Sequence, residues 1–165
     1  MQIRPSTLAD APGVTVLLGR SYPALMALAY EPQVLAGVLP LITRANPDLL
    51  ASGTFYVAEE DGAVVGCGGW TFAEPGTGKT ELGLAHIRHF AVDPDQARCG
   101  IGRALFKACA RTAAAEGAER FQALSALNAQ SFYETMGLKR IEDVRVPMGG
   151  DIVFPATLME GAVEG

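Results

Sequence analysis

Apolar positions along the chain follow two different periods, and the change from one to the other marks a central unit. A β-leaning run rich in apolar residues favours a strand over residues 84–92, and the Asp93-Pro94 pair ends it. From residue 100 onward apolar side chains recur at helical spacing, which predicts an amphipathic helix over 100–116. A second apolar run predicts another strand over 120–127, so these segments form a strand–helix–strand unit.

The flanking segments contain further short strands and helices separated by turn residues. Because strands outnumber helices, we predict one α/β (α+β) domain with a mixed sheet, covering residues 1–165. The remaining expected elements are strands at 2–6, 54–59, 63–72, 138–148 and 151–159, a helix from a capping box at Thr7–Asp10 to about Ser21, two helical pieces within 22–51, and a short helix that Asn128 caps and Gly137 ends.

Composition excludes several classes of protein. The 165 residues are 49% hydrophobic and 19% charged, which is typical of a folded globular domain. The formal net charge of −5 argues against nucleic acid as a partner, and no apolar run approaches the ~20 residues that cross a bilayer, so we expect no membrane partner. The chain has no charged-then-apolar leader, and its three cysteines lack metal-type spacing, so we expect a cytoplasmic protein without a metal.

Gly100 and Gly102 lie where the central helix begins, at a place suited to a phosphorylated ligand. Glycine lets a ligand approach the backbone closely, and the first N–H groups of a helix point at an anion. Between His86 and Arg111 the chain has five basic residues and two acidic ones, although the whole protein is acidic. This local positive charge favours an anion site over the alternative that the glycines only shape a turn.

A second glycine-containing segment, residues 76–80, imitates the end of a Walker A nucleotide-binding loop. The full motif needs a glycine five positions before Gly78, where Ala73 stands, and a helix must follow. The sequence instead continues into a strand. We therefore interpret the segment as a loop between strands and reject nucleotide hydrolysis by this route.

Two motifs resemble those of the GNAT superfamily of N-acyltransferases. The first is Val92-x-Pro94 followed by Gly100-Ile101-Gly102-Arg103-Ala104-Leu105, and the second is the run from Leu127 to Leu138, LNAQSFYETMGL. The resemblance extends over nearly the whole chain, and it implies a mostly antiparallel sheet of six to seven strands flanked by helices. One position departs from the family pattern, because Ala97 stands where Arg or Gln is usual.

The resemblance also implies a cosubstrate and the residues that contact it. The cosubstrate is acetyl-CoA, its pyrophosphate held largely by backbone amides and its pantetheine arm lying along a splayed strand. Asn128 matches a position that often contacts the cofactor, although an N-cap asparagine also explains its presence. The residues assigned to the cofactor are Phe90, Ala91, Val92, Arg98, Cys99, Gly100, Ile101, Gly102, Arg103, Asn128 and Tyr133.

Acyl transfer to an amine needs an oxyanion donor, a proton for the departing thiolate and a neutral amine. A backbone N–H on the segment 89–92 would serve the oxyanion, and Tyr133 matches the tyrosine that the family uses as general acid. His86 is the candidate base, because an imidazole with a pKa of ~6.5 accepts a proton near neutrality, directly or through water. His89, Glu81 and water alone remain alternatives. Strand alternation would place His86, Arg88, Phe90 and Val92 on one face and Ala85, Ile87, His89 and Ala91 on the other.

The function predicted from these residues is N-acetyl transfer from acetyl-CoA to a primary amine of a small molecule or a peptide. The alternative is a sensor that keeps the acyl-CoA cradle without turnover. The acceptor pocket would lie between residues 22–51 and the final hairpin, where Tyr22, Met26 and Tyr30 either line it or only fill the core. The resemblance also implies a possible homodimer.

Overall fold

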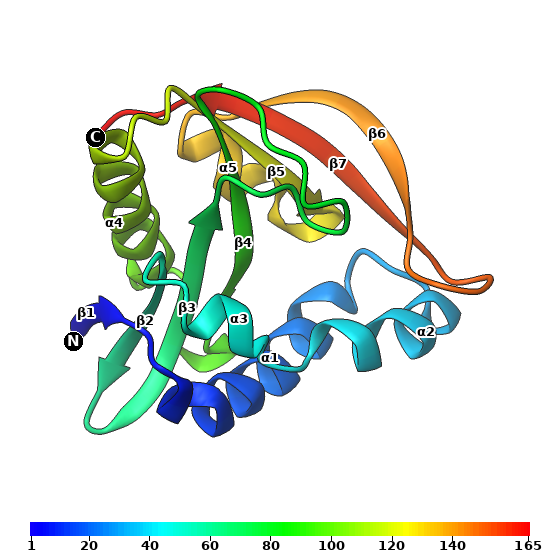
Figure 1. The fold of residues 1–165 in the computed structure, drawn as a ribbon. Coiled ribbons are helices and arrows are strands. Elements are labelled where there is room, and N and C mark those ends of the chain that lie inside the picture. Colours follow the sequence, from blue (N-terminus) through cyan, green and yellow to red (C-terminus); the bar gives the residue numbers. More distant parts are fainter.

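A seven-stranded sheet runs through the computed structural model, which describes residues 1–165 (Figure 1). The strand order is β1-β2-β3-β4-β5-β7-β6, and only the β4–β5 pair is parallel. This arrangement confirms the expected mixed, mostly antiparallel sheet. The strands are β1 (Gln2–Pro5), β2 (Phe55–Glu60), β3 (Ala63–Thr71), β4 (Leu84–Val92), β5 (Arg120–Ala126), β6 (Lys139–Pro147) and β7 (Val153–Ala162).

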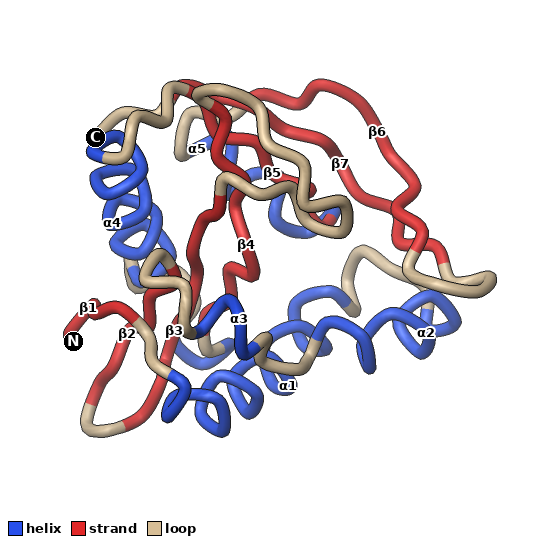
Figure 2. The backbone as a smooth tube through the Cα atoms, in the orientation of Figure 1, coloured by secondary structure: helices blue, strands red, loops and turns tan.

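Helices cover both faces of the sheet, with α1 and α4 well apart in Figure 2. None of them is both long and apolar enough to cross a lipid bilayer. The α-helices are α1 (Ala11–Met26), α2 (Pro32–Ile42), α3 (Pro47–Leu50), α4 (Ile101–Ala115) and α5 (Gln130–Thr135), and three short 3-10 turns lie at Leu8–Asp10, Pro94–Gln96 and Leu127–Ala129.

Strand alternation divides the core into two layers. On β2, Tyr56 and Ala58 point into the cluster that α4 covers, whereas Phe55 and Val57 point into the cluster that α1 and α3 cover. All four side chains are at most 6% exposed. The strand therefore has no solvent-facing side over these residues, which explains why its sequence is continuously apolar.

The first long helix extends beyond the end expected near Ser21. Helix α1 continues through Pro23 to Met26, although a proline inside a helix lacks the N–H of one backbone hydrogen bond. Met26 is only 2% exposed and packs with Tyr30 and Leu35. Burial of this apolar turn offsets the missing bond. The predicted capping box is confirmed, because the Asp10 carboxylate accepts a hydrogen bond from the Thr7 N–H at 2.8 Å.

Strands β4 and β5 pair only at their beginnings and then diverge. Their register joins residues 84–86 to residues 120–122, and no pairing follows (Figure 1). Beyond His86, the β5-facing edge of β4 has no strand neighbour, while β5 continues beside β7. The sheet therefore opens in its middle, between β4 and β5.

A bulge in β4 overturns the simple alternation expected for this strand. Gly69 pairs with Arg88 and Cys67 pairs with Ala91, so His89 and Phe90 together stand opposite Gly68. His89 has a φ of +48°, a conformation that side chains rarely adopt. Phe90 consequently lies on the α4 face with Ile87, and Ala91 lies on the α1 face, opposite to the expectation.

Candidate functional site

The beginning of α4 presents a row of unpaired backbone donors. The first intrahelical bond runs from the Ala104 N–H to the Gly100 carbonyl, and the N–H groups of residues 100–103 have no acceptor. Gly100 has a φ of +84°, and a Cβ there would meet no atom within 4 Å. A Cβ on Gly102 would lie 3.0 Å from the Phe132 ring, so glycine allows α5 to pack closely against the start of α4. This N-terminus can accept a phosphate group.

The surrounding charges favour an anion at this position. Arg98 and Arg103 are exposed and form no ion pair. The two nearby carboxylates, Asp93 and Asp95, are bound by Arg20 of α1 at 3.0 and 3.1 Å. Their negative charge is therefore partly compensated by one guanidinium before a ligand arrives.

The other residues assigned to the cofactor differ in what their side chains can do. Cys99 is exposed beside the loop, whereas Ile101 is 3% exposed and Ala91 is 5% exposed, each within a core cluster. Only main-chain groups of Ile101 and Ala91 can contact a ligand. On the open edge of β4, the Tyr22 hydroxyl donates to the Phe90 carbonyl at 3.2 Å.

Tyr133 lies on α5, next to the bulge of β4. Its ring meets the Phe90 ring edge-on, with centroids 6.3 Å apart. The residue is 7% exposed, and its hydroxyl has no hydrogen-bond partner. Burial raises the pKa of this phenol well above its usual value, so Tyr133 keeps its proton across the physiological range.

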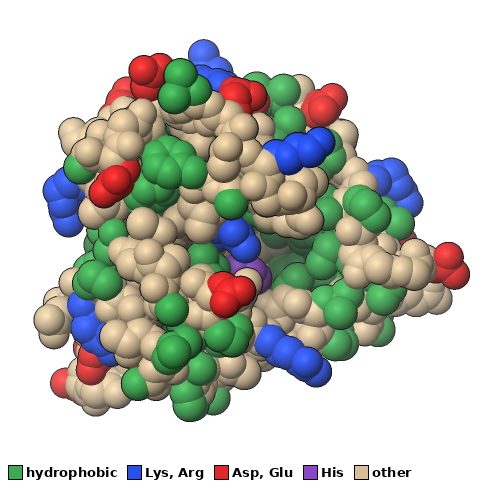
Figure 3. Space-filling view, in the orientation of Figure 1, with side chains coloured by type: hydrophobic (Ala, Val, Ile, Leu, Met, Phe, Trp, Pro, Cys, Tyr) green, Lys and Arg blue, Asp and Glu red, His purple; other side chains and the backbone are tan.

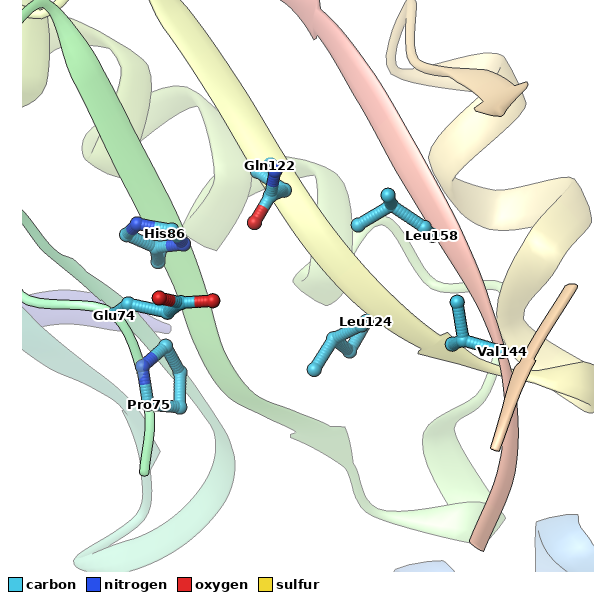
Figure 4. A pocket seen from close by; sticks show the side chains of 7 residues that line it. All are labelled: Glu74, Pro75, His86, Gln122, Leu124, Val144 and Leu158. Carbon is cyan, nitrogen blue, oxygen red and sulfur yellow. The ribbon is translucent and has the colours of Figure 1, made fainter. Parts of the chain in front are cut away.

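A cleft of about 260 Å³ lies over β4, β5, β6 and β7, on the face opposite α4. Figure 4 shows the His86 ring directly beside the Glu74 carboxylate, with Gln122 across from both. In the space-filling view, histidine atoms lie inside a hollow next to basic and acidic atoms (Figure 3). The lining residues are Glu74, Pro75, His86, Gln122, Leu124, Val144 and Leu158.

His86 is only 5% exposed at the bottom of this cleft. Burial lowers the pKa of its imidazole below the usual 6.5, and the nearby Glu74 carboxylate offsets part of that effect. The ring is therefore neutral near pH 7 and can accept a proton. The structure places His86 in the cleft, and its role as base stays a prediction.

Comparison with known proteins decides the family. An acetyltransferase (GNAT) domain model matches residues 51–140, more than half of the chain. This protein belongs to the GNAT acetyltransferase family. It is therefore an acyltransferase, and the family resemblance read from its two motifs is confirmed.

Solved GNAT structures share the fold of this chain at low sequence identity. A GCN5-related N-acetyltransferase from Rhodopseudomonas palustris is 20% identical, with a TM-score of 0.74 over 98% of this chain and 94% of that one. The PaiA N-acetyltransferase from Thermoplasma acidophilum, solved in complex with coenzyme A, is 15% identical, with a TM-score of 0.72 over 98% of each chain. The sequence has no significant match among curated proteins.

The alternatives to His86 as base occupy different positions in this GNAT domain. Glu81 lies outside the cleft lining, is largely exposed and forms an ion pair with Arg120. His89 lies in the bulge, where burial and the neighbouring Arg88 lower the pKa of its ring to about 4. Of the three side chains weighed, only His86 lines the cleft.

One local prediction about the GNAT motif around α5 is wrong. Asn128 does not cap the helix, because it lies inside a 3-10 turn and the N-cap of α5 is Ala129. The Asn128 side-chain oxygen is buried and has no hydrogen-bond donor. A buried oxygen without a donor is unusual, so the side chain remains available for a ligand N–H or O–H.

Sequence reasoning did not assign a role to three polar residues near the cleft. Glu74 comes from the loop that imitates a Walker motif, and nothing in its local pattern indicates that it faces His86. Gln122 pairs with His86 across the β4–β5 register, which requires the strand pairing to be known. Arg88 shares a face with His86 by simple alternation, so that signal was present in the sequence.

Proposed function

We propose that this GNAT acyltransferase transfers an acetyl group from acetyl-CoA to a primary amine of a small molecule or a peptide. The observation that carries the proposal is the row of unpaired N–H groups at residues 100–103, next to an open strand edge that leads to Tyr133. The PaiA N-acetyltransferase was solved with coenzyme A, which supports the choice of cosubstrate.

The residues present fit coenzyme A. The N–H groups of residues 100–103 would hold the pyrophosphate, with the exposed Arg98 and Arg103 side chains adding positive charge. The edge of β4 over residues 90–92, which has no strand neighbour on the β5 side, would hold the pantetheine amides. Asn128 would use its buried, donor-free oxygen for the same ligand.

The chain's own groups account for each requirement of the transfer. Acetyl-CoA, when bound, supplies an acetyl thioester that an amine can attack. A backbone N–H of the segment 89–92 would donate to the acyl oxygen as negative charge develops there. His86 would take the proton of the amine, directly or through water, because its ring is neutral near pH 7. Tyr133 would give its proton to the departing sulphur.

The test is amine-dependent release of free coenzyme A from acetyl-CoA, measured by chromatography because the exposed Cys99 thiol would itself react with a thiol reagent. A panel of small amines, amino acids and short peptides serves as acceptors. Release above the rate without an amine, together with the acetylated amine in the mass spectrum, supports the proposal. Tight binding of acetyl-CoA without any amine-dependent release contradicts it and favours the sensor alternative.

A further inference from the structure

We propose that Arg88 binds a carboxylate of the acceptor, so that the preferred substrate is a free α-amino acid rather than a simple amine or a peptide N-terminus. This inference rests on the acetyltransferase function proposed above. It begins from an unusual guanidinium on the cleft side of β4.

Arg88 is a half-buried cation that lacks an acidic partner. Every other lysine or arginine of the chain is exposed, except Arg4, which pairs with Asp10 and Glu59. The only hydrogen bond of the Arg88 side chain goes to the Thr71 hydroxyl, at 3.0 Å. Burial lowers the pKa of Arg88, so the protein pays an electrostatic penalty for this charge. An anionic ligand would remove that penalty.

Strand geometry places the Arg88 side chain next to the proposed chemistry. Thr71 stands directly opposite His86 in the β3–β4 register, so Arg88, Thr71 and His86 share one face of the sheet. Arg88 and His86 are two residues apart on β4, a separation of about 7 Å. Arg88 also precedes the bulge at His89 and Phe90. It therefore lies between the candidate base and the open edge that would hold the thioester.

The cleft also contains a carboxylate, that of Glu74, which could face the ammonium group of an amino acid. The Glu74 carboxylate lies beside His86 and forms no ion pair with Arg88 or any other cation; its only side-chain partner is the Thr77 hydroxyl at 2.7 Å (Figure 4). One carboxylate without a cationic partner in the cleft and one guanidinium without an acidic partner on the same face of β4 complement a zwitterion. An ammonium group would face Glu74 and His86, and a carboxylate one carbon away would face Arg88.

Peptide N-termini and amines without a carboxylate fit this arrangement less well. In a peptide, a neutral amide replaces the carboxylate next to the amine, so Arg88 would remain without a counterion. A charge-assisted hydrogen bond to a shielded group changes affinity by about 10- to 100-fold. We therefore expect a discrimination of this size between an amino acid and its amide.

The experiment compares each L-amino acid with its own amide as acceptor at saturating acetyl-CoA. Rates are calculated per unprotonated amine, because the amide has the lower amine pKa. The wild-type enzyme should show a kcat/KM about 10- to 100-fold higher for its best amino acid than for the matching amide. Arg88→Gln should reduce this ratio to within about threefold, mainly by raising the KM of the acid, and Arg88→Lys should retain part of it.

Two further variants test whether the effect is specific. Lys139→Gln removes an exposed cation at the far end of β6 and should leave the ratio unchanged. Glu74→Gln should raise the KM of acid and amide alike, because both acceptors carry the ammonium group. The KM for acetyl-CoA should stay within about twofold in the Arg88 variants.

The outcomes separate this inference from the proposed function. If amides or peptides are acetylated with the same kcat/KM as free amino acids, the role of Arg88 is refuted, but the proposed acetyltransferase function stands. An equal loss of activity toward acid and amide in Arg88→Gln would refute it as well, since a merely structural role predicts that result. Absence of turnover with every acceptor would overturn the proposed function itself.

Discussion

Replacement of Tyr133 by phenylalanine tests the chemical step most directly. The variant keeps the ring and its edge-on contact with Phe90, and it removes only a hydroxyl that has no hydrogen-bond partner. No buried group is left unpaired, so the free energy of unfolding should change by less than about 1 kcal/mol. Any large effect on catalysis must then come from the lost proton donor.

The expected loss follows from the surroundings of the hydroxyl. General acids contribute about 10²- to 10⁴-fold to a rate. Because Tyr133 is only 7% exposed, water replaces it poorly as proton donor to the sulphur, which makes the loss larger. A thiol has a lower pKa than an alcohol, so a thiolate leaves without a proton more readily than an alkoxide, which makes the loss smaller. We therefore expect kcat to fall by about 100- to 1,000-fold, while the dissociation constant of acetyl-CoA changes by less than about twofold.

The assay is initial-rate release of coenzyme A, combined with calorimetric binding of acetyl-CoA. Tyr56→Phe is the matched control, because Tyr56 is 6% exposed in the same core cluster but bonds Thr112 at 2.9 Å, away from the cleft. The control should keep its kcat. A kcat for Tyr133→Phe within twofold of the wild type would refute the proton-donor role.

Three other predictions address the base, the cofactor loop and the stability of the fold. The acidic limb of the pH–rate profile should have its midpoint below pH 6.5, because burial lowers the pKa of His86, and His86→Gln should abolish this limb. If only His89→Gln alters the limb, the base is His89 and not His86. Gly102→Val should weaken acetyl-CoA binding by at least tenfold in calorimetry, because its side chain would collide with the neighbouring aromatic ring, and unchanged affinity would mean that the loop holds no phosphate. The Arg4 guanidinium lowers the pKa of Asp10, so this ion pair stabilises the fold fully above the unfolded-state pKa of ~3.9 and is lost as the pH falls through the lower folded-state pKa. The difference in Tm between wild type and Arg4→Ala should therefore shrink below about pH 4. A difference that stays constant with pH would contradict this ion pair.

The sequence was informative wherever one local pattern determines the structure. Periodicity alone predicted the strand–helix–strand unit, and the motif at Gly100 and Gly102 predicted the free helix N-terminus. The bulge at His89 could not be predicted, because it depends on the register between β3 and β4 and on the room that Gly68 leaves for Phe90. An extra residue in a strand leaves its apolar composition unchanged, yet every side chain after it points to the opposite face of the sheet.

The candidate site was predicted in part for the same reason. Tyr133 and His86 were assigned from motif position and strand spacing, which are local properties. Glu74 belongs to the loop between β3 and β4, and its place beside His86 depends on how that loop folds back over β4, which no local pattern indicates. The Asn128 cap was expected from residue preference alone, but the preceding 3-10 turn shifts the start of α5 and leaves that side chain elsewhere.

Helix α1 links two parts of the enzyme that could otherwise change independently. Arg20 binds the carboxylates behind the phosphate loop, and two residues later Tyr22 bonds the Phe90 carbonyl on the open edge of β4. Mutations that tilt α1 will therefore disturb the proposed phosphate site and the proposed pantetheine edge together. Directed evolution of new acceptors should accordingly favour changes in the Glu74 loop and in β6 over changes in α1.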